Sequence, residues 1–109
     1  MFIRVTAQRV KPEDRETYIK TFVEEARQVQ VAEPDNANYY FMQDINDENN
    51  FVFVAAFKDR AAFEHHLEMP HFKQYKEIFA TRGIKPETTV YWECANIVPD
   101  DSFFLRQKG

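Results

Sequence analysis

Hydrophobic and polar residues alternate along residues 2–10 (FIRVTAQRV), as they do in a β-strand that buries one face. Over residues 12–31 the apolar residues instead recur every three to four positions, which predicts a helix. Pro12 suits the first turn of that helix, where its missing N–H leaves no hydrogen bond unmade. Residues 39–45 and 51–57 are two predicted strands, joined by the polar turn NDENN. The first half of the chain is therefore expected to form a strand, a helix and a hairpin.

A broken helix is predicted for the second half of the chain. Asp59 is a suitable N-cap for a helix over residues 60–68, and Pro70 must end or kink that helix because proline lacks an N–H group. The helical spacing restarts over residues 71–82, and Gly83 is placed to stop it. The break falls within the stretch that holds all three histidines of the chain.

A last predicted strand over residues 88–98 completes the order βαββαβ, with the second helix interrupted. This order is typical of the ferredoxin-like α+β fold, in which a four-stranded antiparallel sheet carries its helices on one face. No repeat or linker divides the chain. We therefore expect one domain over residues 1–98, followed by a C-terminal tail over residues 99–109.

Both faces of the predicted sheet are apolar, although two helices can cover only one of them. The alternating residues of the strand 51–57 are Phe51, Phe53, Ala55 and Phe57 on one side and Val52, Val54 and Ala56 on the other. An exposed apolar sheet is covered most simply by a second copy of itself, packed face to face. The sequence therefore predicts a homodimer.

Composition and charge narrow the classes of partner. The formal net charge is −4 and charges of both signs are interspersed, which argues against a nucleic-acid partner. Gly83 and Gly109 are the only glycines, which excludes glycine-rich loops that cradle nucleotide phosphates. The chain has no apolar run near the roughly 20 residues that span a bilayer, no leader-like start, and one cysteine, Cys94. We expect a cytoplasmic protein without membrane contact.

Several motifs together resemble the antibiotic biosynthesis monooxygenase (ABM) family. They are VKPE at 10–13, AEP at 32–34, RG at 82–83 and, above all, FVFVAAFKDRAAFEHHLEMPHF at 51–72. The resemblance covers roughly residues 3–98 and implies a dimeric α/β barrel. Relatives in this family include cofactor-independent quinol or anthrone oxygenases, the isomerase of phosphorylated autoinducer-2, and haem-degrading enzymes. The family therefore does not decide the reaction.

The chain departs from that family at positions tied to its best-known chemistry. The third strand often ends Glu–x–Trp, and this chain has Ala55 and Phe57 there. Phe53 stands where the anthrone-oxygenase type has Asn, and Phe63 aligns with a Tyr. Lys76 lies near the place where the haem-degrading type needs a histidine ligand. The resemblance therefore disfavours haem, and the anthrone-type residue set cannot be transferred to this chain.

The three histidines have different expected roles. His66 shares the apolar stripe of its helix and is either a half-buried residue bonded to a backbone carbonyl or a base at a pocket between helix and sheet. His71 stands where the helix restarts and either packs against Phe72 or meets an anionic ligand at the free N–H groups. His65 points toward solvent. His66 and His71 are therefore the candidate catalytic residues.

Metal and thiol chemistry are not expected. A metal site needs three or four convergent ligands, and His66 and His71 have no obvious third partner in the sequence. Cys94 lies on a predicted strand beside Trp92, where a cysteine is usually a small buried apolar residue. We therefore predict no metal and no cofactor.

A polar row and a set of aromatic residues form the candidate binding site. Arg4, Thr6 and Gln8 share one side of the first strand, and they either line a pocket or face water at the edge of the dimer. Thr6 and Gln8 are candidate substrate-binding residues in the pocket interpretation. The aromatic candidates, which core packing alone would also explain, are Phe53, Phe57, Phe63, Tyr75 and Trp92. A pocket framed by them would suit a small apolar or aromatic ligand.

Three functions stay open from the sequence. In a cofactor-independent oxidation, His66 or His71 removes a proton from a small quinol or enol, and the resulting carbanion reacts directly with O₂. An isomerase of a small carbonyl compound would use the same proton abstraction without oxygen. A dimeric binder of an apolar molecule would catalyse nothing, and loss of the family's Trp and Asn favours this alternative.

Overall fold

The computed structural model describes residues 1–34, 37–85 and 88–95. It has the predicted order of strands and helices, with the second helix divided in two. The tail over residues 99–109 and residues 96–98 of the predicted last strand lie outside the described residues, while residues 94 and 95 are described and do not continue the strand as predicted. The elements are β1 (Phe2–Arg9), the 3₁₀ turn η1 (Pro12–Asp14), α1 (Arg15–Ala32), β2 (Ala37–Gln43), β3 (Asn50–Phe57), α2 (Arg60–Leu67), α3 (Pro70–Thr81) and β4 (Thr88–Glu93).

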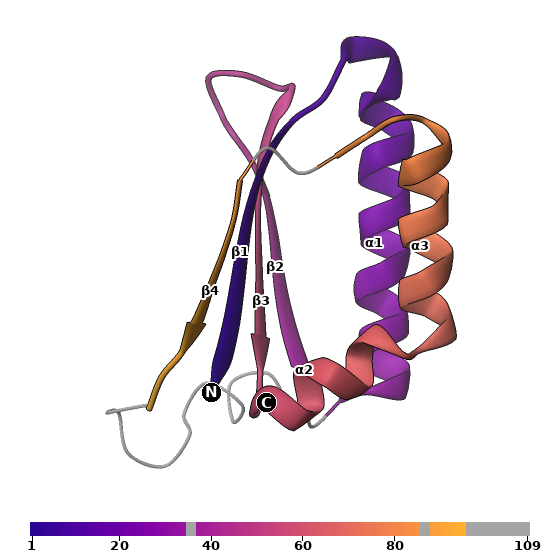
Figure 1. The fold of residues 1–109 in the computed structure, drawn as a ribbon. Coiled ribbons are helices and arrows are strands. Elements are labelled where there is room, and N and C mark those ends of the chain that lie inside the picture. Colours follow the sequence, from indigo (N-terminus) through magenta and orange to yellow (C-terminus); the bar gives the residue numbers. More distant parts are fainter. Residues whose placement is uncertain (35–36, 86–87, 96–109) are drawn as a thin grey trace.

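The four strands form one antiparallel sheet in the order β2-β3-β1-β4 (Figure 1). The register places Thr6 of β1 opposite Phe53 of β3 on one side and Thr89 of β4 on the other. Helices α1 and α3 lie side by side along one face, and α2 crosses from the sheet to the start of α3 at their lower end (Figure 1). The predicted ferredoxin-like α+β fold is confirmed. None of the described helices has the length and apolarity needed to cross a bilayer.

The helix boundaries follow the residues that predicted them. The Asp59 side chain accepts a hydrogen bond of 2.8 Å from the Ala62 backbone N–H and so caps α2. Pro70 occupies the first turn of α3, where no N–H is needed. After α3, Gly83 has a φ of 70°, a left-handed conformation that costs glycine little. Capping and turn residues therefore set these boundaries.

The strand β2 ends two residues earlier than predicted, at Gln43. The cause is Asp44, which begins the polar turn instead of continuing the strand. Its carboxylate accepts a hydrogen bond of 2.8 Å from the Asn46 backbone N–H, and its own N–H donates to the Asn50 carbonyl at 2.9 Å. Ile45 is consequently 97% exposed rather than part of the sheet.

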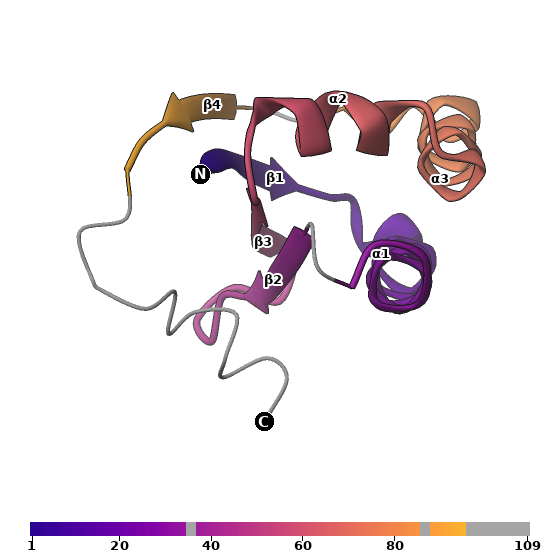
Figure 2. The same cartoon turned by 90° about the horizontal axis from the view of Figure 1, so that it is seen from below.

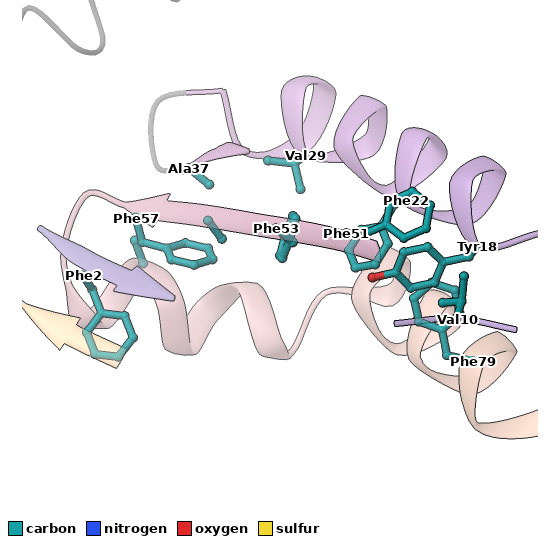
Figure 3. Close-up of a cluster of buried hydrophobic side chains, with 12 residues drawn as sticks. Phe2, Val10, Tyr18, Phe22, Val29, Ala37, Phe51, Phe53, Phe57 and Phe79 are labelled. Carbon is teal, nitrogen blue, oxygen red and sulfur yellow. The ribbon is translucent and has the colours of Figure 1, made fainter. Parts of the chain in front are cut away.

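Aromatic side chains fill the core between the sheet and the helices. Figure 3 shows the buried side chains arranged along β3, with those of α1 and α3 facing them. The Phe22 ring lies 4.7 Å from the Phe53 ring and 5.2 Å from the Phe79 ring, measured between centroids. Each fully buried ring of this kind contributes roughly 1.5–3 kcal/mol over an exposed one.

The face of the sheet turned away from the helices is apolar as well. Tyr40, Val54, Val5 and Val90 form one row across its four strands. The flanking rows are Met42, Val52, Ala7 and Thr88 on one side and Asn38, Ala56, Ile3 and Trp92 on the other. All the described helices lie on the opposite side (Figure 2). The prediction of two apolar faces is confirmed, and we call this surface the open face.

Replacing Phe57 tests its assignment to the core. Phe57 is fully buried, and its ring lies 5.2 Å from Phe63 and 5.1 Å from His66. We expect Phe57→Ala to lower the free energy of unfolding by about 3–5 kcal/mol, because it leaves a cavity that neighbours cannot fill. Denaturant unfolding of this variant beside Tyr91→Ala, at a 51% exposed ring, measures the difference. A loss of under 1 kcal/mol for Phe57→Ala would contradict the assignment.

Candidate functional site

A cavity of about 500 Å³ lies between the sheet and the helices. Its walls come from β1, β3 and β4 and from all three α-helices, so it forms only when these elements are assembled. The lining is aromatic and carries cationic side chains but no Asp or Glu among the described residues. The lining residues used below are Arg4, Thr6 and Gln8 of β1, Phe53 of β3, Phe63 of α2, Phe72, Tyr75 and Lys76 of α3, Lys85, and Thr89 and Tyr91 of β4.

Arg4 is the most unusual residue of this lining. Its side chain is held between the helices and the sheet, because alternation along β1 turns it to the same side as the buried Phe2. Arg4 is only 8% exposed, and its Nε and Nη2 atoms have no hydrogen-bond partner in the part of the chain that the structure describes. These atoms carry three of the five N–H bonds of a guanidinium. The cavity therefore contains a buried cation with free donors.

Aromatic rings surround the Arg4 guanidinium. Its Cζ atom lies 5.6 Å from the ring centroid of Phe53, 5.7 Å from that of Phe63 and 5.8 Å from that of Phe72. Cation–π contacts of this kind stabilise the charge without using the N–H groups. Tyr75 stands beside Arg4, and burial raises the pKa of its hydroxyl, against the opposing charge and hydrogen bond of Arg4. Tyr75 is therefore a neutral hydrogen-bonding group at physiological pH.

The polar row on β1, formed by Arg4, Thr6 and Gln8, lines the cavity. The structure thus agrees with the interpretation in which this row lines a pocket. Thr6 Oγ1 lies 3.4 Å from Thr89 Oγ1, within hydrogen-bonding distance across the β1–β4 pair. The Gln8 side chain donates a hydrogen bond of 2.8 Å to the Arg9 carbonyl. The Thr6 and Gln8 side chains thus have bonding partners on the sheet. Arg4, in contrast, keeps N–H donors without a partner among the described residues.

The aromatic candidates divide into three groups. Phe53, Phe63 and Tyr75 line the cavity. Phe57 is fully buried in the core beneath it. Trp92 lies on the open face and is 53% exposed; it also lines a shallow hollow with Arg60. The structure therefore brings three of these five rings together around one space.

The two candidate catalytic histidines lie behind the cavity wall. Neither His66 nor His71 lines the cavity. His66 is 0% exposed, and its ring lies 5.0 Å from that of Phe72, which does line it. His66 Nδ1 donates a hydrogen bond of 2.8 Å to Glu33 Oε2, since a carboxylate can only accept. The observed partners of His66 are thus side chains, and not the backbone carbonyl expected in the structural interpretation.

Two further buried groups extend this cluster. The Tyr39 hydroxyl lies 2.5 Å from His66 Nε2, and burial raises the pKa of Tyr39 well above its ordinary value, so it stays protonated and can donate. His71 Nδ1 hydrogen-bonds to Glu25 Oε1. Burial also raises the pKa of the Glu25 carboxyl, and the bond to His71 opposes that effect. His71 Nε2 also lies 3.0 Å from Glu33 Oε2, so five side chains from α1, its C-terminal end, β2, α2 and α3 lie together in one cluster.

The sequence did not reveal the acidic members of this cluster. Glu25 and Glu33 are 2% and 1% exposed, which is rare for glutamate. A signal existed for both, since Tyr18, Phe22, Glu25 and Val29 share the buried stripe of α1 and Glu33 follows Val29 by four residues. Donor atoms of Glu33, His66 and His71 lie within 4.8 Å of one another, so these residues could hold a metal ion.

Two smaller expectations have definite outcomes. Cys94 is exposed, so the expectation that it is a buried apolar residue was wrong. The strand β4 ends at Glu93, and Cys94 follows it at the sheet edge, where its backbone N–H donates a hydrogen bond of 2.9 Å to the Met1 carbonyl. His65 is exposed as predicted, because it lies one position round the helix from His66.

Sequence comparisons place the chain among known proteins. The family model for antibiotic biosynthesis monooxygenases matches residues 1–78. The Synechocystis sp. protein sll1783 is 33% identical over 72 residues, which cover 63% of this chain and 46% of that protein. The Bacillus subtilis protein named "Putative monooxygenase YcnE" is 36% identical over 70 residues, which cover 62% of this chain and 70% of that protein. The match thus spans under half of the Synechocystis protein.

Solved structures share the fold. The "putative antibiotic biosynthesis monooxygenase" of Deinococcus radiodurans has a TM-score of 0.77 and 15% identity, covering 92% of this chain and 98% of that one. The protein of the same description from Nitrosomonas europaea has a TM-score of 0.73 and 21% identity, covering 89% and 99%. At these identities the likeness shows the fold alone.

Proposed function

Because this chain belongs to the antibiotic biosynthesis monooxygenase family, we propose that it oxidises a small quinol- or enol-type molecule inside the cavity between sheet and helices. The observation that carries this proposal is the buried Arg4 guanidinium, which has free N–H donors in an aromatic cavity. A phenolate or enolate oxygen would accept from those donors, and the rings would hold the flat body of the substrate.

The proposed reaction needs no bound cofactor because the substrate supplies the electrons. Arg4 stabilises the deprotonated substrate and so favours loss of its proton to water at the cavity mouth. The electron-rich carbon then reacts with O₂ to form a hydroperoxide. Loss of water from that hydroperoxide leaves one oxygen atom on the carbon as a carbonyl. Tyr75 lies where it can donate a second hydrogen bond to the same substrate oxygen.

The histidines have a positioning role in this proposal. His66 supports Phe72 from behind, and Phe72 in turn packs against the Arg4 guanidinium. His71 ties the start of α3 to Glu25 of α1. A base role for either imidazole would require direct contact with the substrate, and no described imidazole or carboxylate lines the cavity.

We also propose that the protein acts as a homodimer, with two open faces packed against each other. The support is the set of exposed apolar side chains on this face, from Tyr40 at one edge to Trp92 at the other. Aligned packing of two such sheets would bury both and give the dimeric α/β barrel. The interface would leave the cavities of the two protomers on the outer, helix-covered sides.

Non-catalytic binding of an aromatic anion is the second candidate function. The lack of an imidazole or carboxylate among the described lining residues favours it over isomerisation, which needs a group that removes a proton and returns it. Binding alone requires only the rings and Arg4. Oxygen consumption separates this candidate from the first.

An oxygen electrode with a panel of hydroquinones, naphthols and anthrones tests the proposed oxidation. For at least one substrate we expect consumption on the order of 10²-fold above autoxidation, the contribution of one preorganised oxyanion donor. The product should contain one new carbonyl, and one O₂ should disappear per substrate. Tight binding of a panel member without oxygen uptake would instead indicate a binding protein.

A further inference from the structure

The buried cluster behind the cavity has the layout of a metal site. Glu33 Oε2 lies 2.8 Å from His66 Nδ1 and 3.0 Å from His71 Nε2, and the three donor atoms lie within 4.8 Å of one another. Glu33 follows the last turn of α1, while His66 belongs to α2 and His71 to the first turn of α3. These three helix ends meet at the lower end of the molecule (Figure 1). Two imidazole nitrogens and a carboxylate oxygen thus converge on one point.

Hydrogen bonds alone leave this cluster incompletely satisfied. His71 Nδ1 is used by Glu25, and His71 Nε2 has no hydrogen-bond partner among the described residues although Glu33 Oε2 is close to it. In a neutral imidazole, that nitrogen presents a lone pair to the lone pairs of the carboxylate. Glu33 Oε1 and Glu25 Oε2 are likewise buried and without partners in the described part of the chain. A cation at the centre would satisfy the atoms that face one another.

The charges of the cluster point the same way. Glu25 and Glu33 bring two carboxylates into a region that is almost completely buried, and no Lys or Arg pairs with either in the described residues. Buried charges require compensation. With both imidazoles neutral, a single divalent cation would bring the net charge of the cluster to zero.

In each imidazole, the ring nitrogen that faces away from Glu33 is bonded to another side chain, as it is in metal sites. Histidine ligands commonly bond through the other ring nitrogen to a carboxylate or another polar group, which orients the ring. Here Glu25 holds His71 Nδ1 and Tyr39 holds His66 Nε2. The inward nitrogens, His66 Nδ1 and His71 Nε2, are therefore aimed at Glu33.

We propose that Glu33, His66 and His71 bind one divalent transition-metal ion, with Zn²⁺ as the best match to two nitrogens and one oxygen. Ligands about 2.0–2.1 Å from a tetrahedral ion stand roughly 3.3 Å apart, so the Glu33 oxygen needs to separate from each of the two imidazole nitrogens by only a few tenths of an ångström. His66 would carry its proton on Nε2 and donate it to the Tyr39 oxygen. Glu33 Oε1 or a water completes the coordination. The ion is structural, joining α1, α2 and α3 behind the cavity.

Metal binding by the full-length protein tests this proposal. After removal of metal with a chelator, Zn²⁺ is added in competition with a chromophoric chelator, and the thermal midpoint Tm is followed in parallel. The experiment uses Cys94→Ser protein, because the exposed thiol of Cys94 could bind zinc by itself. We expect one zinc per chain and a rise in Tm on the order of 10 °C at 100-fold excess over Kd.

Matched variants assign the binding to the cluster. His71→Asn and Glu33→Gln should lose zinc binding and the Tm shift, whereas His65→Ala removes an exposed histidine of α2, the helix that carries His66, and should keep both. Co²⁺ in place of Zn²⁺ should show ligand-field absorption bands that His71→Asn abolishes. If Glu33→Gln fails to fold, His71→Asn decides, since His71 is the least buried ligand. Absence of stoichiometric zinc in Cys94→Ser protein, or its retention in His71→Asn, overturns the proposal.

Discussion

Arg4→Met is expected to reduce kcat/KM for the proposed quinol oxidation by roughly 10²–10³-fold while leaving the fold as stable or more stable. The activity falls because the guanidinium is the only group of the described cavity lining that combines burial, positive charge and free N–H donors. The stability is maintained because those buried donors, without partners, cost about 1–3 kcal/mol in the free protein. Methionine fills a similar volume among the rings of Phe53, Phe63 and Phe72.

Steady-state oxygen uptake and thermal unfolding of the same preparation measure both parts of this expectation. Arg9→Gln is the matched control, because Arg9 lies on the same strand but is exposed and paired with Asp47 at 2.6 Å on the surface. It should keep full activity. Arg4→Lys keeps the positive charge but lacks the planar guanidinium with its fixed N–H donors, so it should keep only part of the rate. A large loss of Tm in Arg4→Met, or unchanged turnover, would show that Arg4 supports the fold rather than the substrate.

Val54→Asp is expected to convert the proposed homodimer into a folded monomer. Val54 lies in the central row of the open face, beside Val5 and Tyr40. A two-fold interface contains each substituted residue twice, so two carboxylates would be buried without partners. We expect the dissociation constant to rise by at least roughly 100-fold, about 3 kcal/mol. The isolated protomer should keep its fold because the face is open to water in the monomer.

Sedimentation velocity across a range of concentrations measures this change, with circular dichroism to check the fold. Val31→Asp is the control, since it makes the same substitution at a 75% exposed position on α1, away from the open face. It should remain dimeric. The dimer proposal would be abandoned if the unmodified protein sediments as a monomer, or if Val54→Asp still forms a stable dimer.

Local sequence signals predicted most of the fold. Alternation along residues 51–57 and the helical spacing in residues 12–31 correspond to β3 and α1 because burial of apolar side chains follows the geometry of each element. The helix boundaries are set within one turn of the residues that predicted them. Asp59 caps α2, Pro70 begins α3, and Gly83 ends the turn after α3, as expected. The early end of β2, at Gln43, arose from a side-chain hydrogen bond of Asp44 that alternation does not report.

The candidate site was only half visible in the sequence. Thr6, Gln8 and Arg4 could be grouped because residues two apart on a strand share a face. The same reasoning could not separate Phe53, which reaches the cavity, from Phe57, which lies beneath it, since both have the same parity. Their difference depends on α2, whose Phe63 and His66 pack against Phe57.

By itself, the sequence determined the α+β class, the strand order along the chain, the helix break at Pro70 and the presence of two apolar sheet faces. Only the tertiary structure decided which polar side chains meet. Glu33 lies 33 residues from His66, and Glu25 lies 46 residues from His71, yet each pair is hydrogen-bonded in the buried cluster. Periodicity reports the face on which a side chain lies. It does not report its neighbour across the core, because that contact depends on the packing of separate elements.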